Sequence, residues 1–270
     1  HGYLPPGFLE YAPFPNSRNH ALRNHQTAIP APLWLPYQLY KWLIVVPVLL
    51  ISTLILGTLI IILCFIGMAN MASRVIARLW ARLNSTIMFM RVEVEGQEHL
   101  QPGQSYILAA NHLSLVDIYL LYGYTNLDLK WVMKQELRKI PILGLACELM
   151  GHIYVDRSNS NAAVTSIESA RERIRDGMCV VFFPEGTRSR TSELRPFKKG
   201  AFRMAVDLGI PVIPVSIHHT DDILPSDTLD WRPGDTKLIF HAPIAVDKNS
   251  DANNLTRQTR QIIVNALAEN

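Results

Sequence analysis

The stretch Tyr106–Asp117 reads YILAANHLSLVD and joins an apolar run to a polar turn. The run Tyr106–Ala110 has the length and composition of a buried strand in an α/β domain. Of the 9 histidines in the chain, His112 alone has an aspartate at the fifth position after it. This spacing is either chance or a pair of residues that act together.

Two readings of the turn are open at this point. Ser114 and Asp117 have the spacing of a capping box, in which Asp117 only starts a helix. In the other reading, Asp117 lies in the first helical turn beside the imidazole of His112. It then fixes one ring nitrogen and stabilises the imidazolium, so that the other nitrogen takes a proton from a hydroxyl.

A second polar turn follows another apolar run and reads PEGTRS from Pro184 to Ser189. Turn residues are expected after a strand, but a simple turn does not explain Arg188 between two hydroxyl residues. An arginine with hydroxyls and backbone N–H groups is typical of a phosphate site. Lys198 precedes an expected helix, whose positive end also favours anions. The alternative for the lysines here is a solvated face.

Residues 91–270 alternate between short apolar strands and helical stretches. The expected strands are Arg91–Glu95, Ser105–Ala110, Lys130–Met133, His152–Val155, Met178–Phe183, Val212–Ile217 and Lys237–Phe240. The expected helices are Leu115–Tyr122, Leu143–Met150, Ala162–Arg175, Ala201–Leu208 and Leu255–Ala268. This alternation predicts an α/β domain with a mixed, largely buried sheet flanked by helices.

Several polar residues come directly after expected strands, namely His112, Lys134, Arg157 and Glu185–Arg188. In open α/β sheets, ligand sites gather at the carboxyl ends of the strands. We therefore expect these side chains to meet at one edge of the sheet.

The stretch from Trp42 to Ser73 contains no charged residue, and about 20 apolar residues are enough to cross a membrane. We assign residues 37–69 to a membrane-embedded helical segment; the alternative is a buried helix of a soluble protein. Pro47 and Gly57 leave room for a kink or a re-entrant hairpin, so both spanning and re-entry are open.

A basic amphipathic helix is expected over residues 70–90, next to this segment. Arg74, Arg78 and Arg82 repeat every four residues and share one face. Such a helix suits anionic lipid headgroups and a cytoplasmic placement of the following domain. The alternative is ordinary flanking charge without lipid specificity.

The composition fits this organisation. With 270 residues, 18% charged residues and a net charge of +3, the chain has room for one substantial domain and an accessory segment. Its 3 cysteines show no disulfide or metal pattern. Residues 1–36, rich in Pro, Asn and His, are expected to form a disordered tail or an artificial extension. The sequence lacks the signatures of serine hydrolases, P-loop enzymes and zincins.

Together, the two turns resemble the hallmarks of the glycerophospholipid acyltransferases, NHLSLVD their N-H-x-x-x-x-D motif and FPEGTRS their second motif. Further blocks match in the same order, namely Lys134–Leu137 with Ile140-Pro141 and Gly144, Val155–Arg157, Phe197–Gly200 and Ile210–Val215. The similarity covers about Glu93 to Ile217 and is greatest to bacterial 1-acyl-glycerol-3-phosphate acyltransferases.

This resemblance implies a mechanism. His112 would be the general base on the sn-2 hydroxyl of lysophosphatidic acid, and Asp117 would orient it. The hydroxyl would attack the thioester of acyl-CoA or acyl-acyl carrier protein directly, without a metal or a bound cofactor. The substrate-binding residues would be Asn111, Ser114, Lys134, Arg157, Glu185, Gly186, Thr187, Arg188 and Lys198.

The resemblance also implies the binding partners and the cellular location. We expect membrane lipids, lysophosphatidic acid and the acyl donor as partners, no nucleic acid, and the inner membrane of a bacterium with the domain facing the cytoplasm. Two alternatives stay open. One is the same transfer to glycerol-3-phosphate, another lysophospholipid or a lyso-ornithine lipid; the other is a non-catalytic lipid-binding protein. The sequence sets no oligomeric state.

Overall fold

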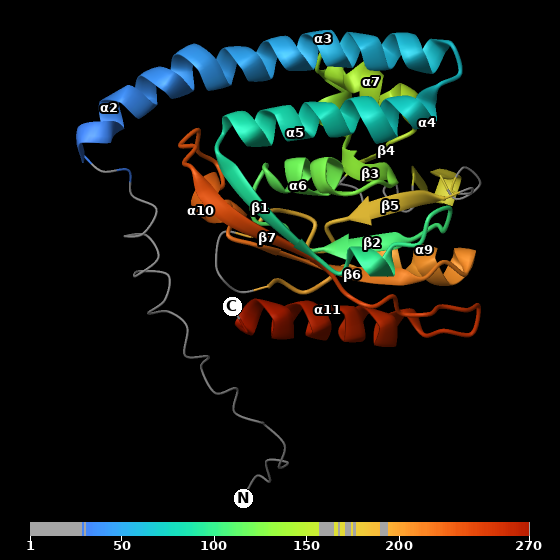
Figure 1. Cartoon of the computed structure of the whole chain (residues 1–270). Helices are drawn as coiled ribbons and strands as arrows, with labels where there is room; N and C mark the ends of the chain where they lie inside the picture. The colour runs from blue at the N-terminus through green and yellow to red at the C-terminus, as the bar shows by residue number, and fades with distance from the viewer. Residues whose placement is uncertain are drawn as a thin grey trace, which may run out of the picture.

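The computed structural model describes residues 29, 31–156, 165–166, 168–170, 174, 177–189 and 194–269. In this part of the chain, the strands form one seven-stranded sheet of order β1-β7-β6-β2-β5-β3-β4 (Figure 1). They are β1 (Met90–Glu95), β2 (Ile107–Ala110), β3 (Asp128–Lys134), β4 (Ile153–Val155), β5 (Met178–Phe182), β6 (Val212–His218) and β7 (Gly234–Phe240). Each predicted strand is present, which confirms the α/β class.

The sheet is mixed, as predicted, and its strand directions decide where loops meet. Strand β2 pairs in parallel with β5 and β6, and β3 pairs in parallel with β5 and β4. Strand β7 is antiparallel to β6, and β1 is parallel to β7. The carboxyl ends of β2, β3, β4, β5 and β6 therefore lie at the same edge of the sheet.

Helices cover both faces of the sheet (Figure 1). One layer contains α5 (Ala77–Ile87), α6 (Asp117–Tyr124) and α7 (Leu143–Leu149); the other contains α9 (Gly200–Leu208) and α11 (Ala252–Ala268). Strand β2 shows why both layers are needed. Leu108 and Ala110 belong to one buried core, whereas Ile107 and Ala109 belong to the other. Alternate side chains of a strand point to opposite faces, so both faces of β2 require apolar cover.

Several boundaries differ from the predicted ones. Helix α11 begins before Leu255 because Asp251 caps it, accepting hydrogen bonds from Asn253 N at 2.9 Å and Asn254 N at 3.2 Å. The short helix α10 (Thr220–Ile223) and the 3-10 segments η3 (Gln97–His99) and η4 (Gln135–Lys139) were not predicted. Of the predicted helix over residues 162–175, residues 165–166 and 168–170 are helical, and most of the rest lies outside the described residues.

The apolar N-terminal segment is one continuous helix. It comprises α2 (Ala31–Tyr40), the π-helical segment η1 (Lys41–Val45) and α3 (Val46–Phe65). Over 34 residues, Pro32–Phe65, it is long and apolar enough to cross a membrane. Residues 31–36, assigned above to the tail, are therefore helical; Pro32 fits because a proline in the first turn has no intrahelical N–H bond to lose.

The chain reverses its direction after α3, and not at Pro47 or Gly57, where the sequence left room for a kink or a hairpin. Pro47 and Gly57 both lie inside α3, and the turn forms at Gly67, whose φ of 81° suits glycine. The chain returns through α4 (Ala69–Met71) and the π-helical segment η2 (Ala72–Ile76) into α5, which runs beside α3 (Figure 1). Trp80 Nε1 donates to Thr53 Oγ1 at 3.0 Å and links the two helices.

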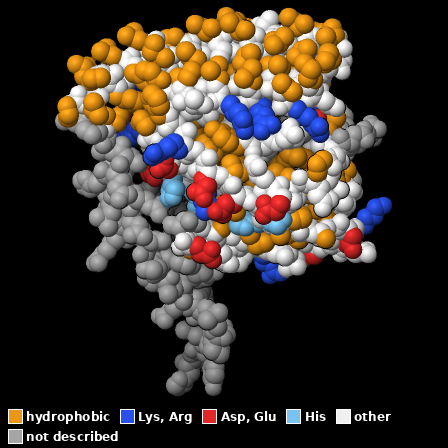
Figure 2. Space-filling view, in the orientation of Figure 1, with side chains coloured by type: hydrophobic (Ala, Val, Ile, Leu, Met, Phe, Trp, Pro, Cys, Tyr) orange, Lys and Arg blue, Asp and Glu red, His pale blue; other side chains and the backbone are white. Residues whose placement is uncertain are grey.

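Two arginines of the basic helix contact the protein. Arg78 Nε and Arg82 Nε donate to the carbonyl of Gly123 at 3.2 and 2.7 Å, so these arginines bind the negative end of α6. The other face carries the exposed Val75 and Leu79. Figure 2 shows hydrophobic side chains covering the outer layer, where α3 and α5 lie. Arg78 and Arg82 share a face, as their spacing predicted, and the apolar Val75 and Leu79 are exposed on another side of the helix.

Candidate active site

The two predicted turns come together at the carboxyl edge of the sheet. Loop 111–116 follows β2 and loop 183–189 follows β5, and these two strands are parallel neighbours. Two hydrogen bonds join the loops, from His112 N to Glu185 Oε1 at 3.0 Å and from Ser189 N to the carbonyl of His112 at 2.7 Å. Residues about 70 positions apart in the sequence thus form one site because parallel strands end at the same edge.

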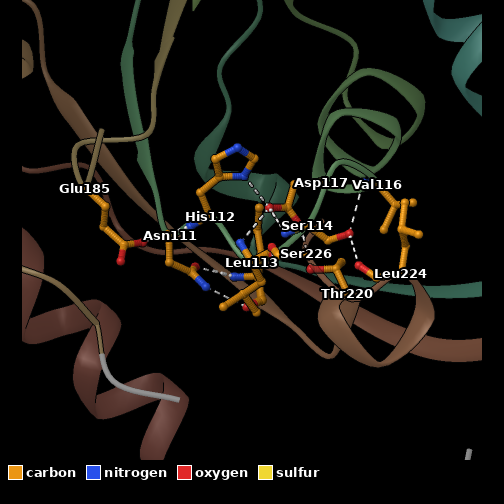
Figure 3. Close-up of polar contacts among 11 residues, drawn as sticks. Asn111, His112, Leu113, Ser114, Val116, Asp117, Glu185, Thr220, Leu224 and Ser226 are labelled. Carbon is orange, nitrogen blue, oxygen red and sulfur yellow. Dashed lines mark hydrogen bonds and ion pairs between the residues drawn. The ribbon is translucent and has the colours of Figure 1, made fainter. Parts of the chain in front are cut away.

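His112 and Asp117 form a hydrogen-bonded pair. The distance from His112 Nδ1 to Asp117 Oδ2 is 2.7 Å (Figure 3). Since a carboxylate accepts, Nδ1 carries the proton and Nε2 is left as the basic nitrogen. In the described part of the structure, no protein group bonds Nε2, which points away from Asp117 (Figure 3). The pair has the arrangement of a general base with an orienting carboxylate.

The carboxylate of Asp117 is fully buried and held by four donors. Besides the imidazole, Oδ2 accepts from Leu113 N at 2.9 Å and Ser114 N at 3.0 Å. Oδ1 accepts from Thr220 Oγ1 at 2.5 Å. The bond from Ser114 N has the direction found in a capping box, but α6 begins at Asp117 itself and its N-cap residue, Val116, makes no side-chain capping bond. Of the two readings of the sequence, the contact to the imidazole is the one that the carboxylate makes directly.

The plane of the imidazole is fixed by an aromatic residue that the sequence did not single out. The ring of His112 stacks on Phe183 with centroids 3.8 Å apart and an angle of 11°. Phe183 in turn lies 5.8 Å from the ring of Trp131. Phe183 directly precedes the PEGTRS turn, so the second motif supplies a supporting surface for the base of the first.

Asn111 and Ser114, predicted as substrate-binding residues, are buried within the fold. Asn111 Nδ2 donates to the carbonyl of Ile217, and Asn111 Oδ1 accepts from Ile217 N, each at 2.8 Å. Ser114 Oγ donates to the carbonyl of Leu224 at 2.6 Å. These contacts occupy the polar atoms of both side chains. In this structure they hold the loop that carries His112, and substrate binding by them stays a prediction.

Glu185 has a similar supporting position. Its carboxylate is buried and accepts from His112 N and Arg195 N, each at 3.0 Å. Burial raises the pKa of Glu185, against the two backbone N–H groups, which favour the ionised form. Glu185 thus links the loop that carries His112 to the segment before α9. Its side chain is buried and does not lie at the surface of the site.

The loop beyond Glu185 presents the cationic groups. Gly186 has a φ of 77°, and a Cβ there would lie 2.9 Å from Cε and Nζ of Lys198. The missing side chain therefore leaves room for Lys198 to cross the loop. Thr187 is exposed, and Arg188 Nη2 lies 3.2 Å from Asp227 Oδ1 with 27% of the arginine side chain exposed. Arg188 and Lys198 thus lie in or across one loop, and the binding of an anion there stays a prediction.

Two further predicted residues stand apart from this group. Lys134 ends β3, and its Nζ lies 3.3 Å from Glu136 Oε1, with 55% of its side chain exposed. It shares the edge of the sheet with His112 but follows a strand on the far side of β5. Arg157 lies outside the described residues.

The sequence reasoning missed the segment after β6. Thr220 contacts Asp117, Ser226 Oγ donates to the carbonyl of Leu113 at 2.9 Å, and Asp227 pairs with Arg188. A usable signal was present, because β6 was predicted and its carboxyl end reaches the same edge.

Comparisons with known proteins agree with this geometry. Residues 91–218 match the family described as Acyltransferase. A 1-acyl-sn-glycerol-3-phosphate acyltransferase of Chlamydomonas reinhardtii is 32% identical over 77% of this chain and 62% of that protein. The chain therefore spans less than two thirds of that relative. The corresponding alpha enzyme of Homo sapiens is 32% identical over 72% of this chain and 69% of its own length.

A solved structure shows the same fold. It is the 1-acyl-sn-glycerophosphate (LPA) acyltransferase PlsC from Thermotoga maritima, with a TM-score of 0.71 and 26% identity. The match covers 92% of this chain and 96% of the solved one, and so includes the helices outside the sheet. The chain belongs to the glycerophospholipid acyltransferase family.

Proposed function

We propose that this protein transfers a fatty acyl group from an acyl thioester to the sn-2 hydroxyl of 1-acyl-glycerol-3-phosphate, giving phosphatidic acid. The observation that carries the proposal is the 2.7 Å contact between His112 and Asp117, which leaves Nε2 available as a base. The names of the relatives support the choice of acceptor. The geometry supports the choice of chemistry.

The proposed reaction is a direct transfer. Nε2 of His112 removes the proton from the hydroxyl as its oxygen attacks the carbonyl carbon of the thioester. The carbon–sulfur bond then breaks, and the leaving thiolate takes the proton from the imidazolium. Asp117 stabilises the imidazolium between these steps. Binding both substrates beside the base supplies an orientation advantage.

We propose either acyl-CoA or acyl-acyl carrier protein as the donor, with no metal and no bound cofactor. A thioester carbonyl is already activated toward attack, and the base is built into the protein. Neither step above requires a further electrophile. The proposed partners are accordingly the donor, the lysolipid and the lipids of the membrane, and nucleic acid is not among them.

The proposed phosphate site centres on Arg188 and Lys198. Arg188 belongs to the loop that is hydrogen-bonded to His112, and a guanidinium binds phosphate in a bidentate manner. Its present partner Asp227 is half-exposed, so a substrate phosphate can replace it. Thr187 and Lys134 are further candidates on this edge, as is Arg157.

We propose that the outer helical layer contacts the membrane. The exposed large apolar side chains on it include Trp34, Trp42, Leu43, Leu50, Ile55, Ile62, Phe65, Ile66, Val75 and Leu79. Exposed apolar area of this extent is typical of lipid contact. The membrane we propose is the bacterial inner membrane, with the α/β domain on the cytoplasmic side. A long helix packed beside a return helix suits both an embedded layer and delivery of a lipid substrate.

The test is release of thiol from an acyl-CoA by detergent-purified protein, measured with a panel of acceptors. The panel contains lysophosphatidic acid, glycerol-3-phosphate, lysophosphatidylcholine and a lyso-ornithine lipid. We expect release that depends on lysophosphatidic acid and yields phosphatidic acid. Greater release with another acceptor would replace the proposed substrate. No release with any acceptor, from either acyl-CoA or acyl-acyl carrier protein, would favour a non-catalytic lipid-binding protein.

A further inference from the structure

A segment outside both motifs is hydrogen-bonded to His112's loop, residues 111–116, and to Asp117, which follows it. It begins after β6, at α10, and runs to Ser226. Three hydrogen bonds join it to the loop: Thr220 Oγ1 to Asp117 Oδ1, Ser114 Oγ to the carbonyl of Leu224, and Ser226 Oγ to the carbonyl of Leu113 (Figure 3). The family match ends at residue 218, just before this segment. The contact to Asp117 differs from the other two because it reaches a side chain of the catalytic pair.

We propose that Thr220 is a positioning residue for the reaction, acting on His112 through Asp117. Its hydroxyl is the one side-chain donor to Oδ1 of Asp117 among the residues that the structure describes, at 2.5 Å. Oδ2 is shared by the imidazole and two backbone N–H groups. A carboxylate held at both oxygens cannot rotate about its Cβ–Cγ bond. Thr220 therefore fixes the direction in which Asp117 meets Nδ1.

The contact between Thr220 and Asp117 is buried. Thr220 and Asp117 are both 0% exposed, so no bulk water replaces the hydroxyl when it is removed. A hydrogen bond to a buried charged group contributes more than one at the surface, and leaving the charged group with a lost partner is costly. The effect falls on the orienting carboxylate of the base rather than on a substrate group.

The local backbone is arranged to deliver this hydroxyl. His219, which precedes Thr220, has a φ of 62°, a conformation that residues other than glycine adopt uncommonly. Such a conformation persists where surrounding contacts hold it. At the far end of the short helix, the carbonyl of Leu224 accepts from Ser114 Oγ at 2.6 Å. The segment is thus bonded to Asp117 at Thr220 and to the loop 111–116 at Leu224.

Loss of the hydroxyl has a consequence that simple packing would not produce. With Oδ1 unbonded, the carboxylate of Asp117 is free to turn about its Cβ–Cγ bond, and the imidazole of His112 loses its fixed orientation. The hydroxyl bonds to Asp117 and not to a group proposed to bind substrate, so its loss acts on kcat rather than on KM.

The experiment compares Thr220→Val, Thr220→Ala and Thr220→Ser with the wild type in full-length protein. The inference rests on the proposed function, so the wild type must first show acceptor-dependent thiol release with lysophosphatidic acid. Thr236→Val is the matched control: Thr236 is also a buried threonine, and its hydroxyl donates to the carbonyl of His218 at 2.7 Å instead of to a catalytic group.

We expect kcat to fall about ten-fold in Thr220→Val and Thr220→Ala, with KM for lysophosphatidic acid changed less than about two-fold. Thr220→Ser keeps the hydroxyl and should stay within about three-fold of the wild type, as should the control. Folded Val or Ala variants with wild-type kcat would overturn the proposal. So would a folded Thr220→Ser variant whose kcat falls about ten-fold or more, and this second result does not depend on whether the Val variant folds.

Discussion

The loops that carry His112 and Arg188 leave neighbouring strands at the same edge of the sheet, but their functional side chains are held differently. The His112–Asp117 pair is fixed by four donors on a fully buried carboxylate and by the ring of Phe183. Arg188 forms an ion pair with Asp227, which is half-exposed. The base is thus organised before substrate arrives, whereas the cationic group exchanges a protein carboxylate for the substrate phosphate.

The difference teaches which kinetic constant each region should control. A preorganised base acts on the transition state, so its loss lowers kcat. A cation that exchanges partners acts mainly on substrate binding, so its loss raises KM. The predictions below test this division, from the largest expected effect to the smallest.

The largest effect is expected for Asp117→Asn. An amide cannot accept from all the donors around Asp117 and favours the wrong tautomer of His112. We expect kcat to fall about 10³-fold or more. The measurement is steady-state thiol release, with a thermal melt to show that the variant is folded. A folded variant that keeps more than about a tenth of the wild-type kcat would remove Asp117 from the mechanism.

A smaller effect, in the other constant, is expected for Arg188→Ala. Loss of a charge-assisted contact to phosphate should raise KM for lysophosphatidic acid at least about ten-fold and leave kcat within about three-fold. Arg138→Ala is the matched control, since Arg138 is also a surface arginine paired with a carboxylate, that of Glu148. An unchanged KM, or a loss confined to kcat, would contradict the division in which Arg188 controls substrate binding and the His112–Asp117 pair controls kcat.

The smallest effect is expected for Asp227→Asn, and it has the opposite sign. Removing the competing carboxylate should lower KM for lysophosphatidic acid about two- to three-fold, the size of an exposed ion pair. Asparagine tolerates the positive φ of 64° at this position. Asp230→Asn, which removes an acid paired with Arg232 in the same loop, should leave KM unchanged. A higher KM in Asp227→Asn would mean that Asp227 supports Arg188 in the bound state.

Much of the fold was predictable because its signals are local. The apolar runs of β2, β5 and β6 are short and bounded by turn residues, and all three were found near their observed limits. The meeting of His112 with the PEGTRS turn was also predictable, since parallel strands bring their carboxyl ends together. The position of the site therefore followed from polar residues that come directly after strands of an α/β sheet.

The features that the sequence did not predict depend on contacts between residues far apart in the chain, which local residue spacing does not indicate. The arginine repeat of α5 gave a helix face, but the side that faces the protein depends on the carbonyl of Gly123. Motif membership placed Asn111 and Glu185 at the site, but their buried backbone partners lie on other elements. Thr220 reaches Asp117 across more than 100 positions, and nothing in either local sequence indicates the contact.

The central claim, that His112 is the base of an acyl transfer, is tested most directly by acceptor-dependent thiol release from His112→Ala. His241→Ala is the control, because His241 is also a half-buried histidine bonded to a protein group, Ser216, at 2.8 Å. The account predicts that release stimulated by lysophosphatidic acid disappears in folded His112→Ala and persists in His241→Ala. Stimulated release at the wild-type rate from folded His112→Ala would contradict it.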